Sequence, residues 1–174
     1  MTVTDEILEA NRRYAETFQL GHLPMPPAKK LAIVACMDAR LTVEQALGLK
    51  TGDAHIIRNA GGIVTEDALR SLILSHYLLG TQEFVVINHT GCGMQTFQEE
   101  EFRNRLWRET GARAASPAHF FAFRDLEENV REQVLKIRSH PWIPAHIPVR
   151  GFIYDVTTGR LSEVEPGARQ SIPA

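Results

Sequence analysis

The sequence predicts an α/β fold with a mostly parallel β-sheet, flanked by helices and closed at one edge by a C-terminal hairpin. Three short apolar runs rich in β-branched residues alternate with segments of helical periodicity, which is typical of buried parallel strands. The 174 residues, 44% of them hydrophobic, are enough for one core. We expect a single domain over residues 1–174, with a helical arm and linker over 1–27 and an α/β core over 28–174.

The arm begins with an amphipathic helix, which we expect over residues 5–19. Thr4 is the predicted N-cap, and the apolar side chains recur at helical spacing, namely Ile7, Ala10, Tyr14 and Phe18. The segment Pro24–Pro27 ends this element and forms an irregular link. The apolar stripe can pack on a neighbouring subunit or on the chain's own core, and both remain open.

The first half of the core contains two expected strands. Residues 31–35 form the first, and residues 54–57 form the second. Between them, Thr42 and Gln45 have the spacing of a capping box that starts a short helix. The segment 59–62 follows the second strand as a turn whose glycines can adopt positive φ.

The second half continues the alternation and ends in the hairpin. Thr65 is expected to cap a helix that runs to Leu79 and stops at Gly80, and residues 83–87 form the third strand. Residues 95–109 are helix-like. The apolar side chains of a further expected helix share one face, namely Leu126, Val130, Val134 and Ile137. Residues 149–156 and 161–164 flank a turn and predict the hairpin.

Composition and charge exclude several classes of function. The formal net charge is −2 and no dense basic run occurs, so we expect no nucleic-acid partner. No apolar stretch reaches the ~18 residues that span a bilayer, so we expect no membrane association. The segment Met1–Glu6 is polar and acidic, unlike a secretion signal, which predicts a cytoplasmic protein. The cytoplasm is reducing, so the two cysteines are not expected to form a disulfide.

The two cysteines and one histidine stand where a metal could be held. Cys36 follows the first strand, while His89 and Cys92 follow the third. Ligands of parallel sheets bind beyond the carboxyl ends of the strands, so the three converge if these strands are neighbours. Thiolate and imidazole suit Zn²⁺, and three protein ligands leave a fourth position for water or substrate. The sequence therefore predicts a reactive zinc centre.

Asp38 and Arg40 lie close to Cys36 in the sequence and admit two arrangements. In the first, the carboxylate of Asp38 pairs with the guanidinium of Arg40 and leaves the metal position free. In the second, Asp38 is itself the fourth ligand and closes the site. A switch between the two would make activity depend on pH.

The combined motifs resemble the β-class carbonic anhydrases, and the compact prokaryotic branch most closely. The likeness rests on Cys36-x-Asp38-x-Arg40 and His89-x-x-Cys92, with Arg58-Asn-Ala-Gly61 between them. It covers residues 28–97 closely and extends more loosely to the helix at 125–134 and the strand at 151–155.

The resemblance implies a function for each of these residues. Cys36, His89 and Cys92 would be the zinc ligands, and Asp38 with Arg40 would form the catalytic dyad. The reaction would be attack of zinc-bound hydroxide on carbon dioxide to give bicarbonate. The family implies a homodimer or homotetramer with its pocket near the interface. The same branch includes hydrolases of carbonyl sulfide and carbon disulfide, which are the alternative activity.

Other interpretations of these residues are weaker. A structural zinc site usually has four Cys or His ligands, and the chain has no third cysteine. A hydrolase could use Cys36 or Cys92 as nucleophile with His89 as base, but that leaves the first motif unexplained. A non-catalytic zinc-binding protein remains as an alternative from another class. The remaining histidines lack partners at metal-ligand spacing, namely His22, His55, His76, His119, His140 and His146.

Overall fold

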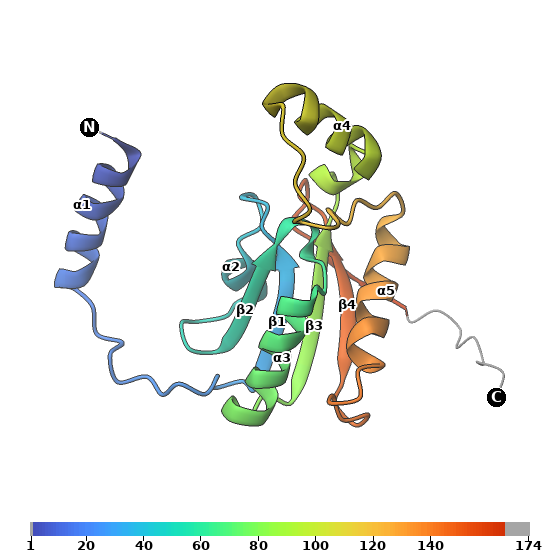
Figure 1. Ribbon diagram of the computed structural model, residues 1–174. Coiled ribbons are helices and arrows are strands. Elements are labelled where there is room, and N and C mark those ends of the chain that lie inside the picture. Colours follow the sequence, from blue (N-terminus) through green and yellow to red (C-terminus); the bar gives the residue numbers. More distant parts are fainter. Residues whose placement is uncertain (1, 166–174) are drawn as a thin grey trace.

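A five-stranded sheet with the order β2-β1-β3-β4-β5 forms the centre of the computed structural model, which describes residues 2–165 (Figure 1). The first four strands along this order are parallel, and β5 pairs antiparallel with β4. The α/β class, the parallel sheet and the C-terminal hairpin are therefore confirmed. The strands are β1 (Leu31–Cys36), β2 (Ala54–Asn59), β3 (Glu83–His89), β4 (Val149–Tyr154) and β5 (Leu161–Val164).

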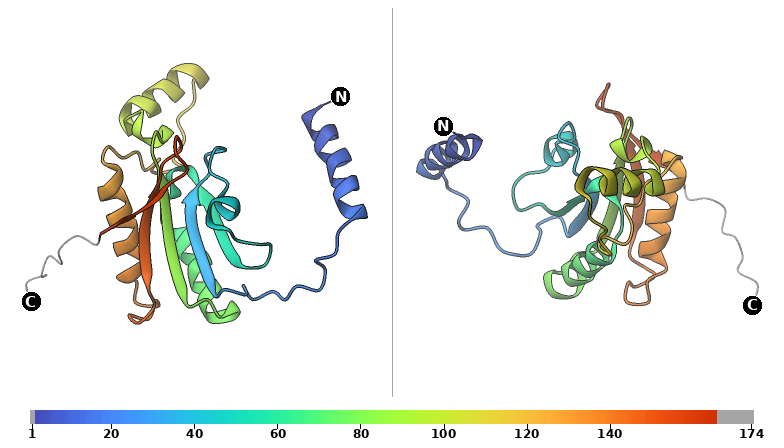
Figure 2. Two further views of the ribbon diagram at one scale, coloured as in Figure 1. Left: turned by 180° about the vertical axis from the view of Figure 1, so that it is seen from behind. Right: turned by 45° about the horizontal axis from the view of Figure 1, so that its top comes forward.

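Helices cover both faces of the sheet. The helices α3 and α5 pack on one face, where α5 contacts β3 and β4, while α2 lies on the other (Figures 1 and 2). The strands β1 and β3 are central and contribute the most deeply buried side chains, including Val34 and Phe84. The helices are α1 (Val3–Glu16), α2 (Val43–Leu47), α3 (Glu66–Leu79), α4 (Glu99–Thr110) and α5 (Leu126–Arg138).

Local capping explains where the helices begin and end. Thr65 caps α3 by accepting a hydrogen bond from the amide of Ala68, and Gly80 ends that helix in the left-handed region, as expected. The N-cap of α1 is Thr2 rather than Thr4, because a capping box with Asp5 satisfies the first amides of the helix two residues earlier. The helix ends at Glu16 and not at residue 19, with Thr17 as its C-cap.

Two further expectations near the site are corrected. The hydroxyl of Thr42 donates to the side chain of Gln45 instead of capping α2, so the capping box predicted there does not form. The helix expected over 95–109 begins only at Glu99, because residues 93–95 form a separate 3₁₀ turn, η2, next to Cys92.

Among the described residues, no helix combines the length and apolarity that crossing a membrane requires.

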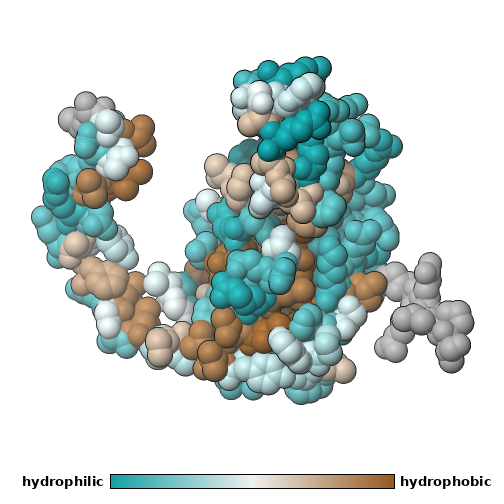
Figure 3. Space-filling model, in the orientation of Figure 1, coloured by the Kyte–Doolittle hydropathy of each residue, from teal (hydrophilic) through white to brown (hydrophobic). Residues whose placement is uncertain are grey.

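The helix of the N-terminal arm does not pack on the core of its own chain. Helix α1 stands away from the sheet on an extended linker (Figures 1 and 2), and it has no buried residue. Its apolar stripe is largely solvent-exposed, with Ile7 at 61% and Tyr14 at 56% of their full exposure. Figure 3 shows apolar side chains along this arm. The arm thus presents an apolar surface that the described residues of the same chain do not cover.

Candidate metal centre

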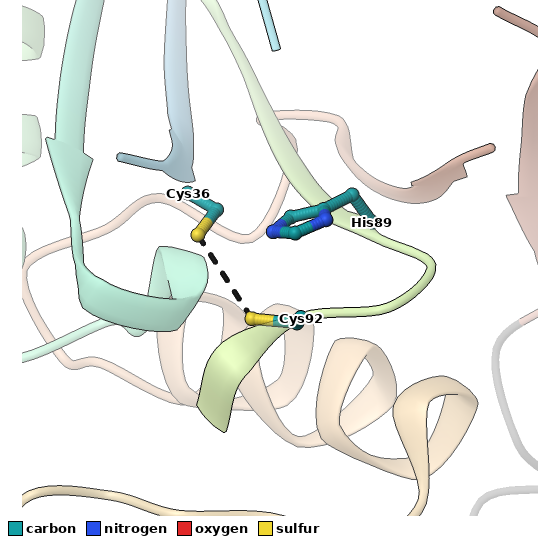
Figure 4. Close-up of side chains that lie close together, drawn as sticks. All are labelled: Cys36, His89 and Cys92. Carbon is teal, nitrogen blue, oxygen red and sulfur yellow. Dashed lines mark hydrogen bonds between the residues drawn. The ribbon is translucent and has the colours of Figure 1, made fainter. Parts of the chain in front are cut away.

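The sheet brings the predicted ligands together at its carboxyl edge. Cys36 is the last residue of β1, His89 is the last residue of β3, and Cys92 follows in the loop after β3 (Figure 4). β1 and β3 are hydrogen-bonded neighbours with Ala35 opposite Ile87, so the two strands end side by side. Adjacent parallel strands therefore join two motifs that lie more than fifty residues apart in the sequence.

The three side chains have the geometry of a metal site. Their ligand atoms all lie within 4.8 Å of one another, and the two sulfurs are 4.0 Å apart. A tetrahedral centre with zinc–sulfur bonds of about 2.3 Å places two sulfurs about 3.8 Å apart. All three residues are buried. The Nε2 atom of His89 is also buried without a hydrogen-bond partner, and it stands out because buried polar atoms normally have one.

The other nitrogen of His89 fixes the orientation of the ring. Nδ1 lies 3.0 Å from the carbonyl oxygen of Thr90 and can donate to it. A proton on Nδ1 leaves the lone pair of Nε2 directed toward the two sulfurs. Histidines that bind metals are commonly held in this way by a second hydrogen bond. The unpaired Nε2 and the two sulfurs therefore fit a metal ion.

The electrostatics of the group favour one thiolate in the absence of metal. The hydrogen bond from Cys92 lowers the pKa of Cys36, with further support from His89 and from the backbone amides of Asp38 and Gly61. The same sulfur–sulfur hydrogen bond, together with burial, raises the pKa of Cys92. Burial opposes a charge on His89, but Cys36 and the carbonyl of Thr90 raise its pKa overall.

Asp38 is paired with Arg40 beside this group. Nε and Nη2 of Arg40 donate to the two carboxylate oxygens of Asp38 at 2.9 and 2.7 Å, which is a bidentate arrangement. This pairing holds the pKa of Asp38 well below its usual range. Nη2 of Arg40 also donates to the carbonyl of Gly91, which ties the pair to the loop that carries Cys92. Asp38 is not part of the compact group of three ligand atoms, and its pairing with Arg40 is the ion pair of the first expected arrangement.

The Arg58–Gly62 segment supports the backbone around the site. Arg58 donates to the carbonyls of Cys36 and Asp38 at 2.9 and 2.7 Å. The side-chain amide of Asn59 both donates to and accepts from the backbone of Ile63, which closes the turn. Arg58 and Asn59 therefore both brace the backbone around the site.

Three residues that sequence reasoning missed lie behind this turn. The amide side chains of Asn88, Asn129 and Gln133 are buried and hydrogen-bonded to one another. The only signal in the sequence is that Asn88 ends an apolar strand run, and that Asn129 and Gln133 interrupt the apolar face of α5.

The other histidines do not form a second site. Among the described residues, the Cys36, His89 and Cys92 group alone has the spacing of a metal site. His55 is hydrogen-bonded to the hydroxyl of Ser75, and His76 to the carbonyl of Thr81. These two histidines therefore have structural partners.

Comparison with known proteins gives a consistent result. The family model described as carbonic anhydrase matches residues 31–161. A beta-carbonic anhydrase 1 of Mycobacterium tuberculosis is 50% identical over 167 residues, covering 95% of this chain and all of the relative. A carbon disulfide hydrolase of Acidithiobacillus thiooxidans is 37% identical, covering 88% of this chain and 84% of the relative. The crystal structure of a carbonic anhydrase from Streptococcus mutans has a TM-score of 0.89 at 48% identity, covering 95% of this chain and 99% of that one.

Proposed function

Because this chain belongs to the β-carbonic anhydrase family, we propose that it catalyses the reversible hydration of carbon dioxide to bicarbonate at a zinc ion held by Cys36, His89 and Cys92. The observation that carries the zinc assignment is the unpaired, buried Nε2 of His89 facing two cysteine sulfurs. When bound, zinc supplies Lewis acidity that makes hydroxide available from water near neutral pH. The activity makes the protein a lyase.

The dyad of Asp38 and Arg40 orients the attacking water. The carboxylate of Asp38 faces the ligand group, and both of its oxygens are held by Arg40. An ionised carboxylate in this position accepts a hydrogen bond from water and directs the oxygen lone pair toward carbon dioxide. Arg40 keeps Asp38 ionised and prevents it from turning onto the metal. We assign the two residues these catalytic roles.

A second activity is favoured by the carbon disulfide hydrolase that resembles this chain. Carbon disulfide and carbonyl sulfide are small linear molecules with an electrophilic carbon, as carbon dioxide is. The same three ligands and the same dyad would serve each of them. We therefore keep hydrolysis of carbon disulfide or carbonyl sulfide as the runner-up.

The test begins with the metal content of the purified protein. It continues with stopped-flow hydration of carbon dioxide from about pH 6.5 to 9, which spans the typical zinc-water pKa of about 7. Stoichiometric zinc with fast hydration is the expected result, and removal of the metal by a chelator must abolish it reversibly. Zinc with slow hydration but rapid release of hydrogen sulfide from carbon disulfide or carbonyl sulfide would favour the runner-up. Zinc without turnover of any of the three would favour a non-catalytic zinc protein, and no zinc would refute the proposal.

We further propose that the protein is a homodimer or homotetramer in the cytoplasm. The exposed apolar stripe of α1 supports association, because an isolated helix with such a stripe gains stability by covering it. Two free cysteine thiols support a reducing compartment, where thiols remain available to bind metal.

A further inference from the structure

We propose that Asn88, Asn129 and Gln133 are positioning residues of the metal centre, because their side chains form a buried amide chain that holds the Gly61–Gly62 turn against Cys36. This inference rests on the proposed zinc site and extends it to residues on α5. None of the three side chains makes a hydrogen bond to a ligand atom. Their effect on the metal passes through the backbone of the turn.

The chain of amides is continuous from α5 to the turn. Nε2 of Gln133 donates to Oδ1 of Asn129 at 3.0 Å, and Nδ2 of Asn129 donates to Oδ1 of Asn88 at 2.6 Å. Nδ2 of Asn88 then donates to the carbonyl of Gly61 at 2.9 Å. The three side chains lie between 1% and 5% exposed, so water does not compete for these bonds. Buried networks of this kind are rigid when every member is satisfied.

Backbone groups at the two ends fix the direction of every amide in the chain. The carbonyl of Gly61 can only accept, so Asn88 must present its NH₂ group there and its oxygen to Asn129. At the other end, the amide of Val64 can only donate, and it donates to Oε1 of Gln133 at 2.9 Å. Each side chain is therefore held in one of its two amide orientations. A chain fixed at both ends specifies the position of the Gly61 carbonyl.

The turn lies directly against the first metal ligand. A Cβ atom on Gly62 would come within 2.9 Å of the backbone nitrogen of Cys36 and 2.8 Å of Nδ2 of Asn88. Gly61 and Gly62 both have positive φ, so this close approach depends on glycine. The backbone amide of Gly61 is among the groups that lower the pKa of Cys36. Gly61 thus accepts from Asn88 through its carbonyl, and the adjoining Gly62 lies against the backbone of Cys36.

Groups around a metal site that hold the backbone of a ligand residue orient its ligand atom. If the amide chain is broken, the Gly61 carbonyl loses its donor, and the Gly61–Gly62 turn is no longer held against the backbone of Cys36. Apolar side chains of similar size would also pack on this face of α5, because it carries Val130 and Val134. If the three amides served core packing alone, replacing them in this way would leave metal binding unchanged. A role in the amide chain predicts that metal binding changes.

The test replaces Asn129 by leucine, which is similar in size but makes no hydrogen bond. The control is Val134→Ala on the same helix, which also removes buried packing but lies outside the amide chain. Zinc affinity is measured by competition with a chromophoric chelator. In parallel, cobalt is bound in place of zinc and the sulfur-to-cobalt charge-transfer band is recorded, because this band reports on the thiolates.

We expect Asn129→Leu to weaken zinc affinity by about 10- to 100-fold and to shift the cobalt band. Val134→Ala should lower the unfolding temperature but leave affinity and band unchanged. Wild-type affinity and spectrum in Asn129→Leu would overturn the inference while leaving the zinc site intact. Failure of the wild-type protein to bind either metal would instead refute the proposed function.

Asn129→Asp provides a second variant if the leucine variant does not fold. It preserves shape and can still accept from Gln133, but a carboxylate cannot donate to Oδ1 of Asn88. Asn88 would then turn its NH₂ group toward position 129 and away from the carbonyl of Gly61. We expect the same shift of the cobalt band, and an unchanged band in this folded variant would also overturn the inference.

Discussion

Oδ2 of Asp38 lies 3.6 Å from Nε2 of His89, and the same oxygen accepts a hydrogen bond from Nη2 of Arg40 at 2.7 Å. A carboxylate with the chemistry of a fourth metal ligand is thus held beside the metal position by an arginine. We propose that competition between Arg40 and the metal for the carboxylate of Asp38 determines whether the site is open to water.

Arg40→Gln should close or disorder the site. Without the bidentate partner, Asp38 is free to move toward the metal, so we expect kcat/KM for carbon dioxide to fall by about 10²-fold with zinc content unchanged. Arg70→Gln is the matched control, because Arg70 also pairs with an aspartate at 2.8 Å but lies on the exposed surface of α3. Wild-type kinetics in Arg40→Gln would contradict the role given to the pair.

The pH dependence of activity should not come from protonation of Asp38. Its hydrogen bonds from Arg40 lower the pKa of Asp38 below the ordinary value of 3.8. The contribution of this pair to stability is therefore fully present above pH 3.8 and is lost as the pH falls through the lower folded value. The difference in unfolding temperature between wild type and Arg40→Gln should be constant from about pH 5 to 8 and shrink in acid.

The proposed switch of Asp38 between Arg40 and the metal has its own test. If the switch contributes to the pH–rate profile, Asp38→Ala should alter the profile as well as its height. An unaltered profile would rule out the switch and leave ionisation at the metal as the source of the pH dependence.

Zinc binding should release protons. Cys92 has a raised pKa and His89 also has a raised pKa, so the metal-free site retains protons that zinc must displace. The zinc affinity should therefore rise with pH between about 6 and 8, by about tenfold per pH unit for each proton released. Chelator competition at several pH values measures the slope, and an affinity independent of pH would contradict the assignment of these ligands.

Gly62→Ala should be much more damaging than Gly80→Ala. Both glycines have positive φ, so both substitutions incur the penalty of about 1–2 kcal/mol for a left-handed residue. A Cβ at Gly80 meets nothing within 4 Å, whereas a Cβ at Gly62 meets backbone atoms of β1 and β3. Urea unfolding of the metal-free proteins should show a larger loss of stability for Gly62→Ala. Equal losses would mean that the turn can move away from Cys36.

Charges on the apolar stripe of α1 should weaken self-association. We expect the double variant Ile7→Asp and Tyr14→Asp to sediment as a smaller species than the wild type at micromolar concentration. Arg12→Asp is the control, because Arg12 lies on the same helix in an exposed ion pair with Glu9. A double variant that sediments like the wild type would show that the arm does not hold the subunits together.

The sequence by itself determined the α/β class, the order of the strands along the chain and the residues of the metal group. Alternating apolar runs and helical periods are local signals. Thiolates and an imidazole at strand ends indicate a metal site by their ligand chemistry alone. The ends of α3 at Thr65 and Gly80 were also predictable, because capping depends on residues within one turn. The start of α1 was not, because Thr2 and Thr4 are both suitable caps and only the bond with Asp5 distinguishes them.

Only the tertiary structure decided that Asp38 pairs with Arg40, since sequence spacing permits both the ion pair and ligation to the metal. The same holds for the amide chain, because Asn88 and Asn129 are forty-one positions apart and are brought together by packing of α5 on β3. For the N-terminal arm, the apolar stripe can be recognised in the sequence. Its exposure depends on where the linker places the helix in the folded chain. Chemistry that resides in one side chain can be predicted locally, whereas hydrogen-bond partners depend on which surfaces the folded chain brings into contact.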